Sequence, residues 1–131
     1  MARVVALIPD LLFGSRVLAA LGGAGHEVQL VGDSAQVREL LAGDGDGAPV
    51  SVLVVDLTRE ELDGAGLIEA LLAEGALQVD TGAIRTLGFY SHVEAEVRER
   101  AERAGFDMVV PRSRMAREGA ELVTRLATAP A

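Results

Sequence analysis

The stretch that decides the fold is Ser51–Ile68, which reads SVLVVDLTREELDGAGLI. It continues an apolar run, Val50–Val55, that has the length of one buried strand and ends at Asp56. A loop follows as far as Asp63, and apolar residues then recur at helical spacing over about Ala65–Ala73. A buried strand, a loop and a helix in this order form the unit from which parallel α/β sheets are built.

The same alternation extends along the rest of the chain. Short apolar runs predict four further strands, over Val4–Ile8, Glu27–Val31, Thr86–Tyr90 and Met108–Pro111. Helical patterns predict four further helices, over Leu11–Leu21, from the capping pair Asp33 and Gln36 to Leu41, over Val93–Ala104, and from Ser113 to about Ala127. The segment Leu77–Arg85 receives no assignment. Five strands alternate with five helices, which predicts one doubly wound α/β domain over residues 1–131.

Composition excludes several classes of protein. Half of the 131 residues are apolar, so a core can form, and the net charge of −8 argues against direct binding of nucleic acid. The chain has no cysteine and no lysine, which excludes thiolate and Schiff-base chemistry. No apolar run reaches the roughly 18 residues that cross a bilayer. We therefore expect a cytoplasmic protein with no membrane contact.

Polar residues follow four of the predicted strands. They are Asp10 after the first strand, Asp56 after the third, Tyr90 and Ser91 at the end of the fourth, and Arg112 after the fifth. In a doubly wound sheet, ligands bind outside the carboxyl ends of the strands. These residues are therefore expected to converge on one site.

Two segments resemble the receiver domains of response regulators. In that family the central strand ends in a phospho-accepting Asp, and an Asp-Gly pair seven residues on opens the next helix; here these are Asp56, Asp63 and Gly64. The segment Ala104–Ser113, AGFDMVVPRS, is similar to the family's fifth strand, in which an AGAD turn leads to a Lys-Pro pair. The resemblance covers essentially the whole chain. It implies a flavodoxin-like (βα)5 sheet with strand order 2-1-3-4-5.

The site departs from the family pattern at several positions. The acidic pair that holds Mg²⁺ is reduced to Asp10, and Tyr90 stands at the switch Thr or Ser, with Ser91 one residue later. Arg112 replaces the lysine, and Ser113 replaces the proline that follows it. The resemblance thus implies an atypical receiver, or pseudo-receiver. Such a domain is a regulatory protein–protein interaction module in signal transduction, is not an enzyme, and works without phosphorylation.

Two alternatives stay open. The first is a functional phospho-receiver with Asp56 as phosphoacceptor, since Asp10 and Asp56 could hold Mg²⁺ weakly; no other metal or cofactor is expected. The second is a flavodoxin-like module that binds a small molecule, for which convergent polar groups are few. Under the non-phosphorylated interpretation, Asp56 pairs with Arg112 or accepts backbone N–H bonds. If Asp56 pairs with Arg112, Arg112→Ala should lower the free energy of unfolding by about 1–3 kcal/mol, because it leaves a buried carboxylate unpaired.

The charge pattern of the predicted fourth helix indicates a surface that binds a partner. Its sequence is rich in charges of both signs, with Glu96 and Arg100 among several pairs at i,i+4 spacing. In receivers, the face of the fourth helix, fifth strand and fifth helix binds partners or a second copy. The resemblance therefore makes four arginines interface candidates, namely Arg98, Arg112, Arg114 and Arg117, and a homodimer is expected.

Overall fold

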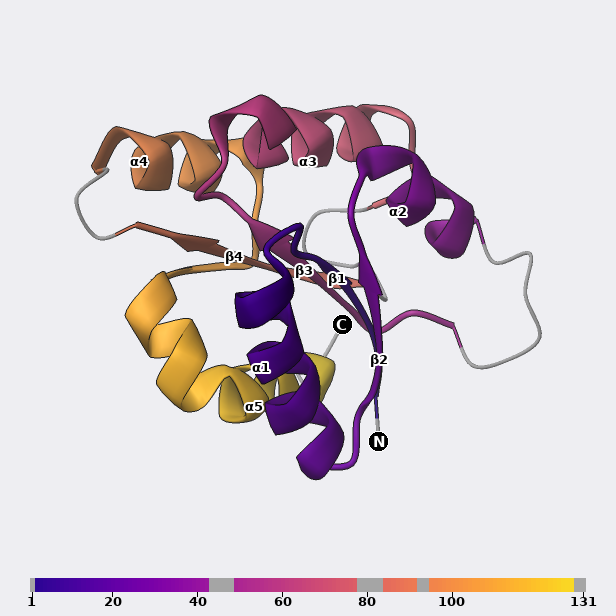
Figure 1. The fold of residues 1–131 in the computed structure, drawn as a ribbon. Coiled ribbons are helices and arrows are strands. Elements are labelled where there is room, and N and C mark those ends of the chain that lie inside the picture. Colours follow the sequence, from indigo (N-terminus) through magenta and orange to yellow (C-terminus); the bar gives the residue numbers. More distant parts are fainter. Residues whose placement is uncertain (1, 43–48, 78–83, 92–94, 129–131) are drawn as a thin grey trace.

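The computed structural model describes residues 2–42, 49–77, 84–91 and 95–128. Its strands are β1 (Arg3–Leu7), β2 (Glu27–Val31), β3 (Val52–Asp56), β4 (Arg85–Tyr90) and β5 (Met108–Pro111). Its helices are α1 (Leu11–Gly23), α2 (Ser34–Leu41), α3 (Gly64–Ala73), α4 (Ala95–Ala104) and α5 (Arg112–Thr128), with a short 3-10 turn, η1, at Glu60–Leu62. Figure 1 shows their arrangement.

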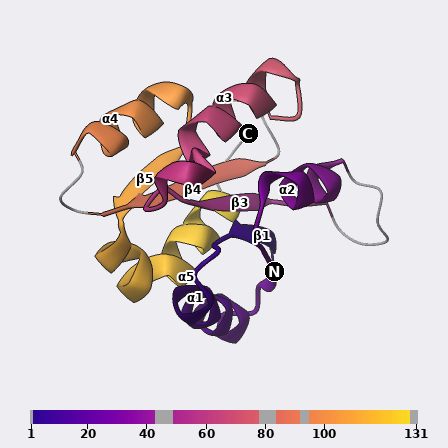
Figure 2. The same cartoon turned by 45° about the horizontal axis from the view of Figure 1, so that its top comes forward.

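The strands form one parallel sheet in the order β2-β1-β3-β4-β5, which confirms the predicted topology. Helices α1 and α5 cover one face of the sheet, and α2, α3 and α4 cover the other (Figures 1 and 2). The sheet is thus the middle layer of three. Among the described helices, none is both long and apolar enough to cross a lipid bilayer.

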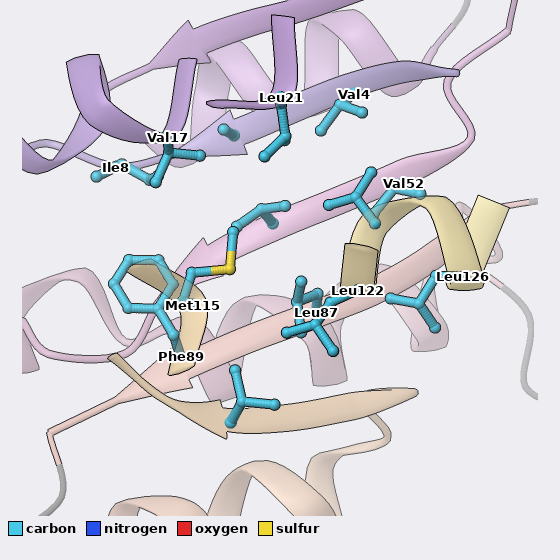
Figure 3. Close-up of a cluster of buried hydrophobic side chains, with 14 of the residues drawn as sticks. Val4, Ile8, Val17, Leu21, Val52, Leu87, Phe89, Met115, Leu122 and Leu126 are labelled. Atoms are coloured by element: carbon cyan, nitrogen blue, oxygen red, sulfur yellow. The ribbon is translucent and has the colours of Figure 1, made fainter. Parts of the chain in front are cut away.

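Two hydrophobic clusters pack on the two faces of the sheet, and β3 contributes to both. Val52 and Val54 belong to the cluster under α1 and α5, whereas Leu53 and Val55 belong to the cluster under α2, α3 and α4. Figure 3 shows the first cluster, in which Met115 and the other labelled side chains of α5 lie over β3 and β4. All five residues of β3 are buried. A strand buried on both faces is apolar at successive positions, which is why Val52–Val55 shows no alternation.

Several helix boundaries follow from capping side chains. Asp33 caps α2 as predicted, because its Oδ1 accepts a hydrogen bond from the amide of Gln36 at 2.9 Å. The Gln36 side chain accepts in return from the amide of Gly32, also at 2.9 Å. The last helix, predicted to begin at Ser113, begins one residue earlier and without an N-cap loop: β5 ends at Pro111 and α5 begins at Arg112. Residues 78–83 and 92–94 lie outside the described part of the chain. They include most of the unassigned segment and the predicted start of the fourth helix at Val93.

His26 connects three parts of the fold at the amino end of the sheet. Its Nδ1 accepts a hydrogen bond from the amide of Ala2 at 3.2 Å, and its Nε2 lies 2.8 Å from the hydroxyl of Thr124 in α5. The Thr124 hydroxyl donates to the carbonyl of Ala120, so the Nε2–H of His26 must donate to Thr124. Only a neutral imidazole satisfies all three contacts. Burial accordingly lowers the pKa of His26 below 6.5.

Acid should therefore weaken the fold through His26. The unfolded chain binds the proton more readily than the folded chain, so this contribution to stability is present above pH 6.5 and is lost as the pH falls toward the lowered pKa. The free energy of unfolding, measured by urea titration, should fall with decreasing pH by at most about 1.4 kcal/mol per unit. His26→Gln should flatten this slope, whereas His92→Gln should keep it. Equal slopes in the wild type and His26→Gln would contradict the assignment.

Candidate functional site

A pocket opens at the carboxyl end of the sheet, between the first turns of α1 and α5 and the loop after β3. Residues from four separate segments line it: Asp10, Phe13, Arg16, Thr58, Arg59, Ser91, Arg112, Ser113 and Ala116. The structure thus brings Asp10, Ser91 and Arg112 together, as predicted. Asp56 and Tyr90 are not among the lining residues.

Asp56 lies at the end of β3, and the residue is only 2% exposed. Its Oδ1 accepts hydrogen bonds from the backbone amide of Thr58 at 2.7 Å and from the Thr58 hydroxyl at 2.5 Å. The partner of the buried carboxylate is therefore the residue two positions later in the chain. The alternative that Asp56 accepts a backbone N–H bond is confirmed, with a hydroxyl as the second donor.

Asp10 serves as the N-cap of α1. Its Oδ1 accepts from the amides of Leu12 at 3.0 Å and Phe13 at 3.2 Å, which are two of the unpaired donors of the first turn. Its Oδ2 lies 3.5 Å from Nη2 of Arg112. The Phe13 amide lowers the pKa of Asp10 most, and the positive charges of Arg112 and Arg59 lower it further. Asp10 is thus held as an anion that already has partners for both oxygens.

Arg112 lies next to Asp10, on the ring of Phe13. Its guanidinium carbon is 4.4 Å from the centre of that ring, a cation–π distance. The Phe13 ring in turn packs against Phe89 of β4 with 5.0 Å between centroids. The proposed ion pair between Arg112 and Asp56 is therefore wrong, because the structure pairs Arg112 with Asp10. A planar, delocalised cation stacks on an aromatic ring more readily than an ammonium does.

The donor set does not fit a magnesium ion. Mg²⁺ requires oxygen ligands in near-octahedral geometry, of which carboxylates are the usual protein part. Both oxygens of Asp10 already have donors, and Oδ1 of Asp56 is occupied by Thr58. Among the described residues, no group of three or more His, Cys, Asp or Glu is placed to hold a metal ion. The arginines of the lining would also repel a cation.

Tyr90 ends β4 and is buried, with 6% of its surface exposed. It packs in the cluster under α2, α3 and α4, on the side of the sheet opposite Phe89. Tyr90 is therefore part of the core and does not line the pocket. Ser91 is partly exposed and lines the pocket. Ser91 and Glu94 also have the spacing of a capping box, but Glu94 lies outside the described residues.

Asp63 and Gly64 open α3, as the motif predicts. Asp63 has a left-handed backbone (φ 44°) and caps the helix by accepting from the amide of Gly66 at 3.2 Å. Arg100 of α4 donates to Asp63 at 2.6 Å and to Glu69 at 3.3 Å. The ion pair with Arg100 is the main reason why the pKa of Asp63 is lowered. The predicted pairing of Arg100 with Glu96 along α4 is not what the structure shows; Arg100 connects α4 to α3.

Three polar lining residues of the pocket were not found from the sequence. Thr58 and Arg59 lie in the loop after β3, and Arg16 lies in the second turn of α1. Thr58 and Arg59 directly follow the third predicted strand. Their position in the loop at the carboxyl end of that strand could therefore have identified them. Arg16 had no such signal, because its approach to the pocket depends on how α1 packs on the sheet.

No family model and no curated protein sequence matches the chain. Solved structures do match it. The receiver domain of Francisella response regulator 1452 superimposes with a TM-score of 0.78 over 97% of each chain, at 15% sequence identity. The chain has the fold of a response-regulator receiver domain.

Other receiver domains give the same result. The signal receiver domain of the putative response regulator NarL from Mycobacterium tuberculosis has a TM-score of 0.74 and 23% identity, over 96% of this chain and 95% of that one. A putative response regulator from Chloroflexus aurantiacus has a TM-score of 0.77 and 15% identity over 98% of both chains. The receiver fold is thus retained at low sequence identity.

The Thr58 hydroxyl should stabilise the receiver fold through Asp56. Thr58→Val keeps the shape of the side chain but removes one of two donors to a buried carboxylate, so the free energy of unfolding should fall by about 1–3 kcal/mol. Thr58→Ser keeps the hydroxyl, so it should lower the free energy of unfolding less than Thr58→Val does. Arg112→Gln, which leaves the Asp56 contacts intact, should also cost less than Thr58→Val. A larger loss in Arg112→Gln than in Thr58→Val, measured by urea titration, would contradict this assignment.

Proposed function

We propose that this chain is a regulatory module of the receiver type in signal transduction. It acts by binding a protein partner or a second copy of itself, and it has no catalytic activity of its own. Its output does not require phosphorylation of Asp56. The proposal places it in the cytoplasm without direct contact to nucleic acid, which the net charge of −8 supports.

The environment of Asp56 carries the proposal. Aspartyl phosphorylation needs an accessible carboxylate oxygen and a divalent cation that offsets charge between this carboxylate and the incoming phosphoryl group. Here the residue is 2% exposed, and its Oδ1 is held by two donors of Thr58. The other acid near the site, Asp10, is committed to the α1 cap and to Arg112. Both requirements of the reaction are poorly met.

The face formed by α4, β5 and α5 supports the binding role. β5 is an edge strand, with Met108 and Val109 only partly buried. Arg98 is about half exposed and pairs with Glu102 at 3.6 Å, and Arg114 pairs with Glu118 at the same distance. Arg117 is 72% exposed and lies at the 4.0 Å limit from Glu118. Exposed pairs of this kind contribute little to stability, so they are available for exchange with a partner.

Incubation with acetyl phosphate and Mg²⁺ tests the first part of the proposal. We expect no gain of one phosphoryl group in the intact mass of the wild type. A gain that disappears in Asp56→Asn would contradict the proposal and favour a functional phospho-receiver. A receiver domain known to be phosphorylated under the same conditions serves as the positive control.

Sedimentation equilibrium tests self-association through the α4-β5-α5 face. We expect a dimer that weakens as salt increases, because exposed ion pairs are screened. Arg98→Glu combined with Arg117→Glu should abolish it, since both cations would become like charges against the partner's acids. The control is Arg16→Glu with Arg38→Glu, which changes the net charge equally on α1 and α2. A monomer at all concentrations, or a dimer that resists the first pair of reversals, would exclude this face as the dimer interface.

A further inference from the structure

We infer that the pocket at the carboxyl end of the sheet binds the phosphate group of a small molecule, directly through arginine and without a metal ion. The inference rests on the pocket's lining and stands apart from the proposed interaction function. Its argument concerns charge, the end of α5, and the way in which Arg112 is held.

The charge of the lining is opposite to that of the whole chain. Arg16, Arg59 and Arg112 face a single acid, Asp10, which gives the lining a net charge of +2 in a protein of net charge −8. Thr58, Ser91 and Ser113 add hydroxyl groups to the same lining. Guanidinium groups donate several hydrogen bonds in a planar fork that matches phosphate oxygens. Three of them gathered around one concave site are the chemistry by which proteins bind phosphate.

The first turn of α5 adds to this positive potential. It begins at Arg112 and contains Ser113 and Arg114 but no acidic residue. The amino end of a helix carries a partial positive charge, so arginines at this position are unfavourable on their own. A bound anion would offset both the helix end and the arginines. By contrast, α1 already has its acid at the corresponding position in Asp10.

Arg112 is positioned before any ligand arrives. Its guanidinium lies on the Phe13 ring at 4.4 Å, and one of its nitrogens is 3.5 Å from Asp10. The remaining N–H groups of the Arg112 guanidinium are available to donate hydrogen bonds to a ligand. Arg59 lies close enough to lower the pKa of Asp10 as well. Among the described residues, no ion pair within 4.0 Å engages Arg16 or Arg59. Arg59 acts on Asp10 only at longer range. Both guanidinium groups can therefore turn to a ligand.

Titration with inorganic phosphate at constant ionic strength tests the inference. The readout is the amide chemical shifts of the pocket, with chloride replacing phosphate in the reference titration and EDTA present to remove divalent cations. We expect saturable shifts at Thr58, Ser91 and Ser113 in the millimolar range. Arg16→Gln with Arg59→Gln should weaken binding by about tenfold or more, because two charged donors are lost. Glycerol phosphate in a parallel arm distinguishes a phosphate ester, which would bind more tightly, from inorganic phosphate itself.

The matched control is Arg38→Gln with Arg125→Gln, which removes two positive charges outside the pocket and should leave binding unchanged. Three outcomes would overturn the inference: no saturation, equal weakening in the control, or binding that appears only in a parallel titration in which Mg²⁺ replaces EDTA. The titration contains no phosphodonor, so its outcome is separate from that of the phosphorylation assay. Failure here would leave the proposed interaction function untouched.

Discussion

Burial of β3 on both faces of the sheet is the constraint on which the rest of the site depends. The strand carries the two hydrophobic clusters, and its last residue, Asp56, is a carboxylate at a place that water hardly reaches. A buried carboxylate must find donors locally or become unstable. The chain supplies them in its next turn, from the amide and hydroxyl of Thr58. The direction of the loop after β3, and with it the position of Arg59, follows from this requirement.

The remaining chemistry of the site follows from the contact between Arg112 and Asp10. Asp10, the acid that follows β1, has two roles. It caps α1, and it accepts a hydrogen bond from the guanidinium of Arg112. Phe13 then fixes the plane of that guanidinium and is itself fixed by Phe89 of the core. One network therefore ties a helix start, a core aromatic pair and a pocket cation together. The lining of the pocket therefore carries three arginines and one acid, which is the charge that the inferred phosphate ligand requires.

The fold was predicted closely because it depends on local sequence patterns, namely short apolar runs for strands and helical spacing for helices. Strand β2 and strand β5 have the expected bounds, and the other strands differ by a residue or two at their ends. The partners of the charged residues were predicted poorly. Arg112 approaches Asp10 and Arg100 approaches Asp63 only after helices have packed, and no spacing in the sequence encodes either contact. Thr58 was within reach of local reasoning, since a hydroxyl two residues after a buried carboxylate is a natural donor.

The central claim is that the strand-end site is cationic and does not bind Mg²⁺. Titration with Mg²⁺, followed through the backbone amide shifts of Asp10, Thr58 and Arg112 and compared with NaCl at equal ionic strength, tests it most directly. The account predicts that Mg²⁺ causes only the small, non-saturating shifts that NaCl also causes. Saturable shifts centred on Asp10 and Thr58, lost in Asp56→Asn, would contradict it.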